Sequence, residues 1–315
     1  MSMNDVNDIR PSSLRHFVGQ TGVVASLGVA IDSCFADNRP LEHCLLVGPA
    51  GTGKSEIAAI LTKEMATKCH ESLGQSIRCN ADLNALLLGA KDKQIVFIDE
   101  VHELEKVFQT ALYLAIDKRR VSVCGTKSVR SIPLAEFTLI LGTTDEYSVL
   151  QPLRDRMKMV LRFDFYGTEE LTQIVQVRAK SLQWELEDGL PAMIAQRSRG
   201  TPRLALRLLQ ACRRVCRAVG EQKIILAHLE RACALDGLDV LGLGRTEQKY
   251  LQALADGATR LNVIASLLGL PARTVSQVTE PFLIRAGLVV KDDQGRRQMT
   301  ALGREHLLKS CRIGV

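Results

Sequence analysis

The residues of this chain best suited to chemistry form a glycine-rich stretch at positions 48–55. They read Gly48-Pro49-Ala50-Gly51-Thr52-Gly53-Lys54-Ser55, which matches the phosphate-binding pattern G-x-x-x-x-G-K-[ST]. The three glycines let the backbone curl and turn its N–H groups toward phosphate oxygens. Lys54 can reach the β- and γ-phosphates of a nucleotide, and the Ser55 hydroxyl can ligate magnesium. The alternative, a glycine-rich turn without function, is disfavoured by the completeness of the pattern.

The segments on either side of this loop suit a phosphate site. An apolar strand is predicted at 44–47, and a helical run begins near Glu56. The helix would add its positive N-terminal end to the binding of an anion. The residues predicted in this region to contact the nucleotide are Gly48, Gly51, Gly53, Lys54, Ser55 and Glu56.

A second run of residues, at 94–98, ends in two carboxylates, Asp99 and Glu100. Its strand-forming residues are typical of a buried central strand of a parallel sheet. Ligands of such sheets collect at the carboxyl ends of the strands, so both carboxylates should face the nucleotide. We expect Asp99 to hold magnesium together with Ser55, and Glu100 to polarise the attacking water as a general base or orienting group. The alternative is a strand that ends in a solvated acidic turn.

Composition places the chain among ordinary globular proteins. Its 315 residues suffice for two or three domains, and 46% of them are hydrophobic and 24% charged. The nine cysteines are scattered without a C-x-x-C pair, which favours reduced thiols and a cytoplasmic location. The first ten residues lack a signal-peptide core, and no apolar segment approaches the length of a membrane span, so we expect no membrane partner.

Positive charge is concentrated near the C-terminus. Between residues 244 and 315 there are 11 Lys and Arg against 6 Asp and Glu, within totals of 41 and 35 and a net charge of +6. A local excess of this sign favours an anionic partner, nucleic acid first. A merely soluble basic surface is the alternative.

Strands and helices alternate through residue 166, which is typical of a parallel sheet with crossover helices. The strands are predicted at 43–47, 76–80, 94–98 and 137–142. At 121–132, β-branched residues lie on either side of a Gly-Thr-Lys turn, which predicts a protruding hairpin.

Helical periodicity dominates from 168 to 235, and Pro202 suits the start of a helix at 203–219. The arginines of that helix can form either a DNA-binding surface or a solvated outer face. They are Arg207, Arg213, Arg214 and Arg217.

A glycine-rich connector at 237–244 leads into a small C-terminal domain. Helices are predicted at 261–268 and 271–286, followed within 288–300 by two short strands around a glycine-containing turn. A helix-turn-helix followed by a hairpin is a winged helix, a frequent DNA-binding unit. The predicted fold is therefore α/β, with a P-loop domain, a helical domain and a winged-helix domain.

Several further strings carry a family resemblance. They are Ile9-Arg10-Pro11, Phe17-Val18-Gly19-Gln20, Ile98-Asp99-Glu100-Val101-His102, Phe137-Thr138-Leu139-Ile140, Pro152-Leu153-Arg154-Asp155-Arg156, Arg199-Gly200-Thr201-Pro202-Arg203 and Glu280-Pro281-Phe282-Leu283-Ile284. With them the chain resembles the RuvB family of AAA+ motors, which drive branch migration of Holliday junctions. The last two strings are the most specific. The resemblance implies an AAA+ ATPase domain at 1–166, a lid at 167–240 and a winged helix at 241–315.

The resemblance also implies roles that spacing alone does not give. It implies ATP and Mg²⁺ as cofactors, a hexameric homo-oligomer, a DNA junction or duplex as client, and a RuvA-type partner docked through the 121–132 hairpin. The implied nucleotide contacts are Ile9 and Arg10 beside adenine, Thr143 and Thr144 as sensors, and Tyr166 and Arg203 in the lid region. Arg156 matches an arginine finger that enters the neighbouring subunit's site. Lys291 and Arg296 match wing residues that contact DNA.

The full predicted catalytic set is Lys54, Asp99, Glu100, Thr144, Arg156 and Arg203. The residues by themselves leave Arg154 and Arg156 open to a structural ion-pair cluster, and we expect His102 to support Glu100 rather than act as a base. Two segments depart from the family pattern. Asp145 stands where an arginine usually follows the paired threonines, and Asp292-Asp293 put two acids at the tip of the wing, which should weaken phosphate attraction.

Three functions compete on this evidence. The first is an ATP-driven DNA motor acting in recombination and repair. The second is an ATP-state switch or loader that binds DNA or protein without translocating. The third is an ATPase for protein clients, whose basic wing is a docking module. DNA-stimulated hydrolysis coupled to strand movement separates the first from the second, and salt-sensitive DNA binding separates both from the third.

Overall fold

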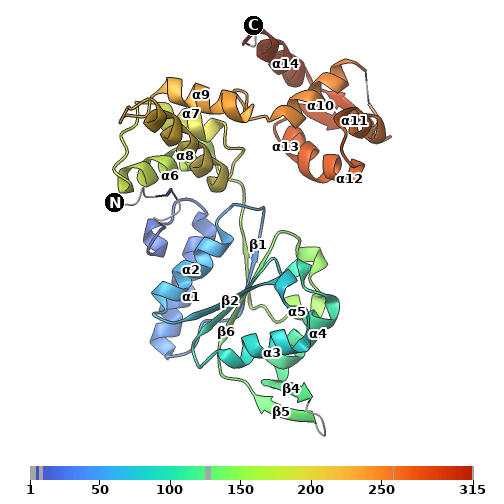
Figure 1. Ribbon diagram of the computed structural model, residues 1–315. Coiled ribbons are helices and arrows are strands. Elements are labelled where there is room, and N and C mark those ends of the chain that lie inside the picture. The colour runs from blue at the N-terminus through green and yellow to red at the C-terminus, as the bar shows by residue number, and fades with distance from the viewer. Residues whose placement is uncertain (1–4, 7–9, 125–128, 258, 314–315) are drawn as a thin grey trace. The chain divides into compact units, whose positions relative to one another are not determined.

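The structure is a computed structural model that describes residues 5–6, 10–124, 129–257 and 259–313 (Figure 1). The chain divides into two compact units, one of Asn7–Glu170 and one of Met1–Val6 with Leu171–Val315.

Five strands of the first unit form one parallel sheet (Figure 1). They are β1 (Cys44–Val47), β2 (Cys69–Leu73), β3 (Ile95–Asp99), β6 (Thr138–Thr143) and β7 (Met159–Arg162). Their order across the sheet is β2-β3-β6-β1-β7, and each neighbouring pair runs parallel. Parallel neighbours need crossover connections, which the intervening helices supply.

The helices that begin in this unit differ widely in length. They are α1 (Thr21–Asp37), α2 (Lys54–Glu64), α3 (Asn80–Gly89), α4 (Lys106–Lys118), α5 (Gln151–Arg154) and α6 (Thr168–Ser181). Short 3₁₀ turns lie at Leu14–His16, Gly74–Ser76, Val101–Glu103 and Glu146–Ser148.

The central strands are buried on both faces because successive side chains alternate between them. Leu45 of β1 and Val96 of β3 belong to one core with apolar residues of α3 and α4. Leu46 and Ile95, their neighbours in sequence, belong to the opposite core with α1 and α2. Strands covered on both sides are near-continuously apolar, which explains why the sequence identified them.

The sequence misplaced one strand of the sheet and missed another, and both are edge strands. The strand expected at 76–80 is instead the end of a 3₁₀ turn and the start of α3, while β2 lies earlier, at Cys69–Leu73. β7 was not predicted at all. An edge strand has only one neighbour and tolerates exposed polar residues such as Glu71, so its apolar signal is weak.

The predicted hairpin is present as a separate antiparallel pair, β4 (Arg120–Cys124) and β5 (Val129–Pro133). Val121 lies opposite Ile132, and the buried Val121 side chain packs into the core beside α4. Residues 125–128 of its turn lie outside the described residues. The base of the hairpin is thus fixed to the hydrophobic core of the first unit.

The second unit begins with helices that form the region expected to be the lid. They are the continuation of α6, then α7 (Leu190–Gln196), α8 (Pro202–Ala218) and α9 (Leu226–Asp236). Pro202 is the first residue of α8, as expected, because its missing N–H is not needed there. Arg207, Arg214 and Arg217 are exposed, while Arg213 lies against the Trp184 ring.

The C-terminal part has the order of a winged helix. Its elements are α10 (Arg245–Ala255), α11 (Leu261–Leu268), α12 (Ala272–Thr274), a π turn (Val275–Thr279), α13 (Glu280–Arg285), β8 (Val289–Lys291), β9 (Arg297–Met299) and α14 (Ala301–Ile313). The single helix expected at 271–286 is therefore interrupted. Pro281 explains this, since it cannot donate a helical hydrogen bond and its ring crowds the carbonyl four residues earlier.

None of the helices, as far as the structure describes them, is both long and apolar enough to cross a bilayer.

Candidate active site

The glycine-rich loop connects β1 to α2, and its backbone is possible only with glycine at two positions. Gly53 has φ 103°, and a Cβ there would lie 2.9 Å from Phe17 Cζ. A Cβ on Gly48 would lie 2.4 Å from the carbonyl oxygen of Phe163. The Gly48 N–H is held by the Thr143 carbonyl oxygen at 3.2 Å, which ties the loop to the end of β6. The loop is a rigid cradle rather than a loose turn.

Lys54 is buried at the start of α2, with 5% of its surface exposed. Its ammonium donates to the carbonyl oxygens of Gly48 at 2.8 Å and Pro49 at 3.0 Å. The Thr52 hydroxyl also donates to Pro49 O, at 2.8 Å. The ammonium is thus folded back over the loop, where a phosphate oxygen could replace either carbonyl oxygen.

Ser55 and Asp99, the two residues expected to hold magnesium, are in direct contact. The Ser55 hydroxyl donates to Asp99 Oδ2 at 2.6 Å, and Asp99 Oδ1 accepts the Glu100 N–H at 2.9 Å. A Cβ on Gly142 of the adjacent strand would lie 2.6 Å from Asp99 Oδ1, so the glycine makes room for the carboxylate. This donor set of hydroxyl and carboxylate oxygens suits a hard cation such as Mg²⁺.

Glu100 is held in a strained conformation at the end of β3. Its φ of 48° is left-handed, which a non-glycine residue rarely adopts. The Thr144 hydroxyl donates to Glu100 Oε2 at 3.3 Å, and His102 Nδ1 lies 3.4 Å from the same oxygen. His102 Nδ1 also lies 3.2 Å from the Thr143 hydroxyl. The predicted base, the paired threonines and His102 therefore form one cluster.

Asp145, which stands where the family usually has an arginine, has a local structural role. Its carboxylate caps the 3₁₀ turn at Glu146–Ser148, where Oδ1 accepts the Ser148 N–H at 3.2 Å and Oδ2 accepts the Ser148 hydroxyl at 2.5 Å. The bond from the Ser148 hydroxyl is the main reason that the pKa of Asp145 lies below its usual value. The acid therefore serves the fold of the turn that follows the paired threonines.

The surroundings of the loop fit a nucleoside. Glu56 Oε1 is buried without a hydrogen-bond partner in the described part of the chain, so an amino or hydroxyl donor of a ligand would satisfy it. Its other oxygen lies 3.9 Å from Arg10 Nε. Tyr166 is buried and donates to Thr52 O at 3.2 Å, and burial raises the pKa of its phenol. Ile9 lies outside the described residues.

Arg156 follows α5 and is bound to a carboxylate that the sequence did not single out. Its Nε donates to Asp117 Oδ1 at 2.7 Å and its Nη2 donates to Asp117 Oδ2. This bond is the main reason that the pKa of Asp117 is lowered. The guanidinium lies 4.8 Å from the centre of the Tyr113 ring. In this structure Arg156 lies against α4.

Arg154 belongs to a second ion-pair group. Its Nη1 lies 4.0 Å from Glu146 Oε1, and the same carboxylate binds Arg162 Nη2 at 2.9 Å. Arg154 and Arg156, for which the sequence left a structural ion-pair cluster open, are thus both ion-paired in the single chain, but in two separate groups. Arg203, the predicted second sensor, is exposed in the first turn of α8, in the other unit.

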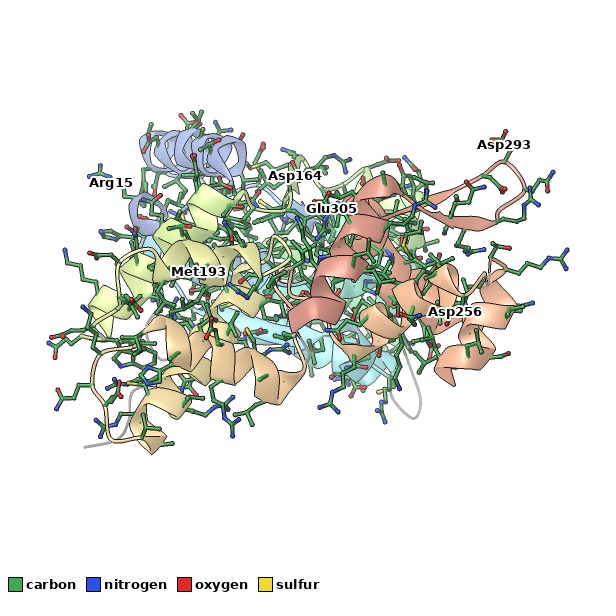
Figure 2. All side chains as sticks on the ribbon, turned by 90° about the horizontal axis from the view of Figure 1, so that it is seen from above. Arg15, Asp164, Met193, Asp256, Asp293 and Glu305 are labelled. Atoms are coloured by element: carbon green, nitrogen blue, oxygen red, sulfur yellow. The ribbon has the colours of Figure 1, made fainter. Side chains whose placement is uncertain are left out.

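The predicted DNA contacts of the wing both carry acidic partners. Lys291 Nζ lies 2.7 Å from Glu280 Oε2, and Arg296 Nε lies 2.9 Å from Asp292 Oδ2. Asp292 also accepts the N–H groups of Gln294 at 3.0 Å and Arg296 at 2.8 Å, so it builds the turn. The hydrogen bond from the Arg296 backbone N–H is the leading cause of the lowered pKa of Asp292. Figure 2 shows Asp293 at the end of the wing, directed outward.

Glu280 is the buried centre of the winged-helix domain's polar contacts. Its carboxylate has no exposed surface and binds Arg297 Nε at 2.8 Å, Lys291 Nζ at 2.7 Å and the Tyr250 hydroxyl at 2.9 Å. Burial alone would raise the pKa of Glu280, but these hydrogen bonds outweigh it and lower the pKa. The sequence indicated this residue only as the first letter of a family-specific string.

Three family models together match nearly the whole chain. They are described as the Holliday junction DNA helicase RuvB P-loop domain at 9–163, the RuvB AAA lid domain at 166–240 and the RuvB C-terminal winged helix domain at 240–308. A protein of Kosmotoga olearia named Holliday junction branch migration complex subunit RuvB is 36% identical over 296 residues, which are 91% of this chain and 86% of that protein. The chain belongs to the RuvB family.

Other RuvB proteins match to a similar extent. The one from Pseudothermotoga lettingae is 33% identical over 308 residues, which cover 95% of this chain and 89% of that protein. The solved structure of the Thermotoga maritima RuvB Holliday junction branch migration motor matches with a TM-score of 0.82 at 33% identity, and covers 95% of this chain and 98% of that one. The AAA+ P-loop, lid and winged-helix architecture expected from the sequence is confirmed, and a RuvB P-loop domain is a nucleotide-binding domain.

Proposed function

We propose that this protein is an ATP-driven DNA motor that moves the branch point of Holliday junctions. The proposal is carried by the geometry of the candidate site on a chain that matches RuvB proteins along nearly its full length. In that site Lys54 folds over the glycine-rich loop, Ser55 contacts Asp99, and Thr144 contacts Glu100. The domain limits of 1–166, 167–240 and 241–315 are part of the proposal. The proposal also places the protein in the cytoplasm of a bacterial cell, where the DNA is.

The chemistry assigned to the site follows from its contacts. The loop N–H groups and Lys54 bind the β- and γ-phosphates of ATP, while Ser55 and Asp99 supply the oxygens for Mg²⁺. Mg²⁺ bound there would neutralise charge on the phosphate oxygens. Glu100 orients and polarises the attacking water, and Thr144 and His102 hold its carboxylate in place. Arg10, Ile9, Glu56 and Tyr166 surround the nucleoside.

Arg156 is assigned to the site of a neighbouring subunit. An arginine that contacts the γ-phosphate in the transition state increases turnover about 10³–10⁵-fold. To act there, Arg156 must exchange Asp117 for a phosphate, a replacement of one anion by another of higher charge. Turnover would then require a ring, for which we propose six subunits, with Thr143, Thr144 and Arg203 sensing the γ-phosphate.

The remaining partners follow the same proposal. The winged helix binds the junction DNA, with Lys291 and Arg296 on its wing, and the 121–132 hairpin docks a RuvA-type protein. Val121 and Ile132 of the hairpin pack in or against the core, which leaves the half-buried Val123 as apolar surface that a protein partner could cover.

The test measures ATP turnover with and without four-way junction DNA, alone and with a RuvA-type protein. Junction DNA should stimulate ATP turnover by the wild-type protein, and the wild-type protein should move the branch point of the junction. Lys54→Ala should lose turnover because the phosphates lose their cation, whereas Lys63→Ala, in the same helix but exposed, should behave as wild type. Wild-type hydrolysis by Lys54→Ala would refute the assigned site.

A second function, an ATP-state switch that binds DNA without moving it, is favoured by the ion-paired wing. If Lys291 and Arg296 are largely neutralised, the grip on phosphate is weak. Junction-stimulated hydrolysis with no movement of the branch point would support this alternative over the motor.

A further inference from the structure

The two most family-specific strings of the sequence meet in the second unit, at Arg199. This residue lies in the turn before α8 and has a left-handed φ of 50°. Its Nε donates to Gly242 O at 2.7 Å, and its Nη1 lies 2.8 Å from Glu247 Oε1. Its guanidinium also lies 4.9 Å from the centre of the Phe282 ring. One side chain of the lid thus contacts the connector, α10 and α13.

A second arginine completes the contact from the other side. Arg285 Nη2 donates to the backbone oxygen of Arg199 at 2.6 Å, and its guanidinium lies 5.3 Å from the same Phe282 ring. Burial, with a contribution from the charge of Arg199, lowers the pKa of Arg285. Two guanidiniums beside one ring repel each other, so this arrangement needs the aromatic face and Glu247 to stabilise it.

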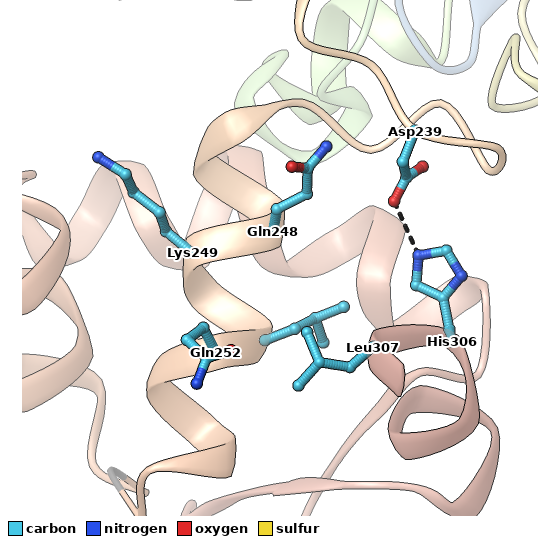
Figure 3. A pocket seen from close by; sticks show the side chains of 7 residues that line it. Asp239, Gln248, Lys249, Gln252, His306 and Leu307 are labelled. Atoms are coloured by element: carbon cyan, nitrogen blue, oxygen red, sulfur yellow. Dashed lines mark hydrogen bonds and ion pairs between the residues drawn. The ribbon is translucent and has the colours of Figure 1, made fainter. Parts of the chain in front are cut away.

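The connector between the lid and the winged helix is itself tightly bonded. Asp239 Oδ1 accepts the N–H groups of Leu241 at 2.9 Å and Leu243 at 2.8 Å. Its Oδ2 lies 2.7 Å from His306 Nε2 on α14, beside a pocket that α10 also lines (Figure 3). A Cβ on Gly242 would lie 2.1 Å from the carbonyl oxygen of Arg197. The glycine-rich connector is therefore a fixed joint rather than a flexible tether.

We propose that Arg199 is the positioning residue that couples the lid to the DNA-binding domain. It stands four residues before Arg203, at the same end of α8. Any displacement of that end must carry Arg199, and with it the connector, α10 and α13. Movement of the lid during ATP turnover would thereby become movement of the winged helix. This proposal rests on the proposed function, because it assumes that the lid responds to ATP and that the winged helix holds DNA.

The test compares Arg199→Ala with Arg213→Ala. Arg213 makes the same kinds of contact, a carbonyl bond to Gln222 O at 2.8 Å and a ring contact with Trp184 at 5.3 Å, but wholly within the lid. We expect Arg199→Ala to keep ATP turnover and DNA affinity within about twofold of wild type while branch migration per ATP falls about tenfold. Hydrogen exchange at 239–244 should rise. Arg213→Ala should change neither migration per ATP nor that exchange.

Phe282→Leu provides an independent variant in case Arg199→Ala fails to fold. Leucine keeps apolar packing but removes the aromatic face that both guanidiniums approach, so the same uncoupling is expected in weaker form. Wild-type migration per ATP in the folded variants would overturn the role of Arg199 while leaving the motor intact. Retained turnover in Lys54→Ala, or no migration by wild type, would instead overturn the proposed function.

Discussion

The phosphate loop and the wing hold their functional cations in opposite ways. Lys54 is buried and donates to two backbone carbonyl oxygens of the loop. Lys291 is more exposed but is paired with Glu280, a fully buried carboxylate whose pKa is lowered. A carbonyl can be displaced by a phosphate at small cost, whereas removing Lys291 would deprive a buried charge of a partner. Counting basic residues therefore overstates the attraction of the wing for DNA.

Arg156 lies between these two cases. Its partner Asp117 is a carboxylate, like that of Lys291, but 40% of the Asp117 side chain is exposed. Water can solvate Asp117 when Arg156 leaves, so the exchange is far less costly than at Glu280. Between Lys291 and Arg156, both paired with a carboxylate, the burial of that carboxylate decides which cation can leave its partner.

The largest effect should come from Arg156→Ala. We expect nucleotide affinity to be retained and turnover to fall about 10³-fold, because a transition-state contact is lost. Nucleotide binding and ATP hydrolysis are to be measured separately, with Arg162→Ala as the matched control, an arginine that is also paired with a carboxylate.

Mixing two inactive variants tests whether Arg156 acts in the site of a neighbouring subunit. If Arg156 acts on a neighbour, a mixture of Arg156→Ala with Glu100→Gln should regain part of the turnover that neither variant has alone. If Arg156→Ala kept full activity, Arg156 would have only a structural role, as the ion-pair partner of Asp117.

Glu280→Gln should have the next largest effect, on stability. Removing a buried charge leaves Arg297 and Lys291 without their shared partner, and we expect the winged-helix domain to lose roughly 3 kcal/mol. Hydrogen exchange of amides in α10 and α13 would report this loss directly. Glu305→Gln, which removes an exposed ion pair on α14, should leave exchange unchanged. Equal exchange in both variants would mean that Glu280 contributes little.

The same carboxylate predicts a dependence on pH. Because the folded-state pKa of Glu280 lies below its ordinary value of 4.5, the unfolded chain takes up the proton first as the pH falls. The stabilisation should be complete above about pH 6 and should be lost as the pH falls through the folded-state pKa. Subtracting the Glu280→Gln profile from that of wild type removes the contribution of other carboxylates. A flat difference would contradict the ionised state assigned to Glu280.

The sequence predicted which residues of the candidate site lie together better than it predicted the partners of the cations. The phosphate loop and the Asp99–Glu100 pair are local patterns, fixed by the spacing of a few neighbouring residues. Their convergence follows from one topological rule, that parallel strands end at the same edge of the sheet. The positions of Lys54, Ser55, Asp99 and Glu100 could therefore be derived without a structure.

The partners could not be derived because they depend on long-range packing. Asp117 is 39 positions from Arg156, and Glu280 is 17 positions from Arg297. Neither spacing follows a helical or strand period, so no local pattern indicates the pair. Edge strand β2 was misplaced for the related reason that its polar residues carry no burial signal. The contact of Arg199 with Phe282 joined two strings that the sequence had marked as specific but could not bring together.

The smallest expected effect is at Asp293. This carboxylate is exposed at the tip of the wing (Figure 2), whereas Asp292 beside it is used in the turn. Asp293→Asn should raise affinity for duplex DNA about twofold at low salt, because one repulsion of phosphate is removed, and the gain should vanish as salt rises. Asp256→Asn, at the end of α10, is the matched control and should bind like wild type. Titrations at several salt concentrations measure both variants. If Asp293→Asn binds no better than wild type, the wing tip does not approach phosphate, and DNA must be held by a different face of the domain.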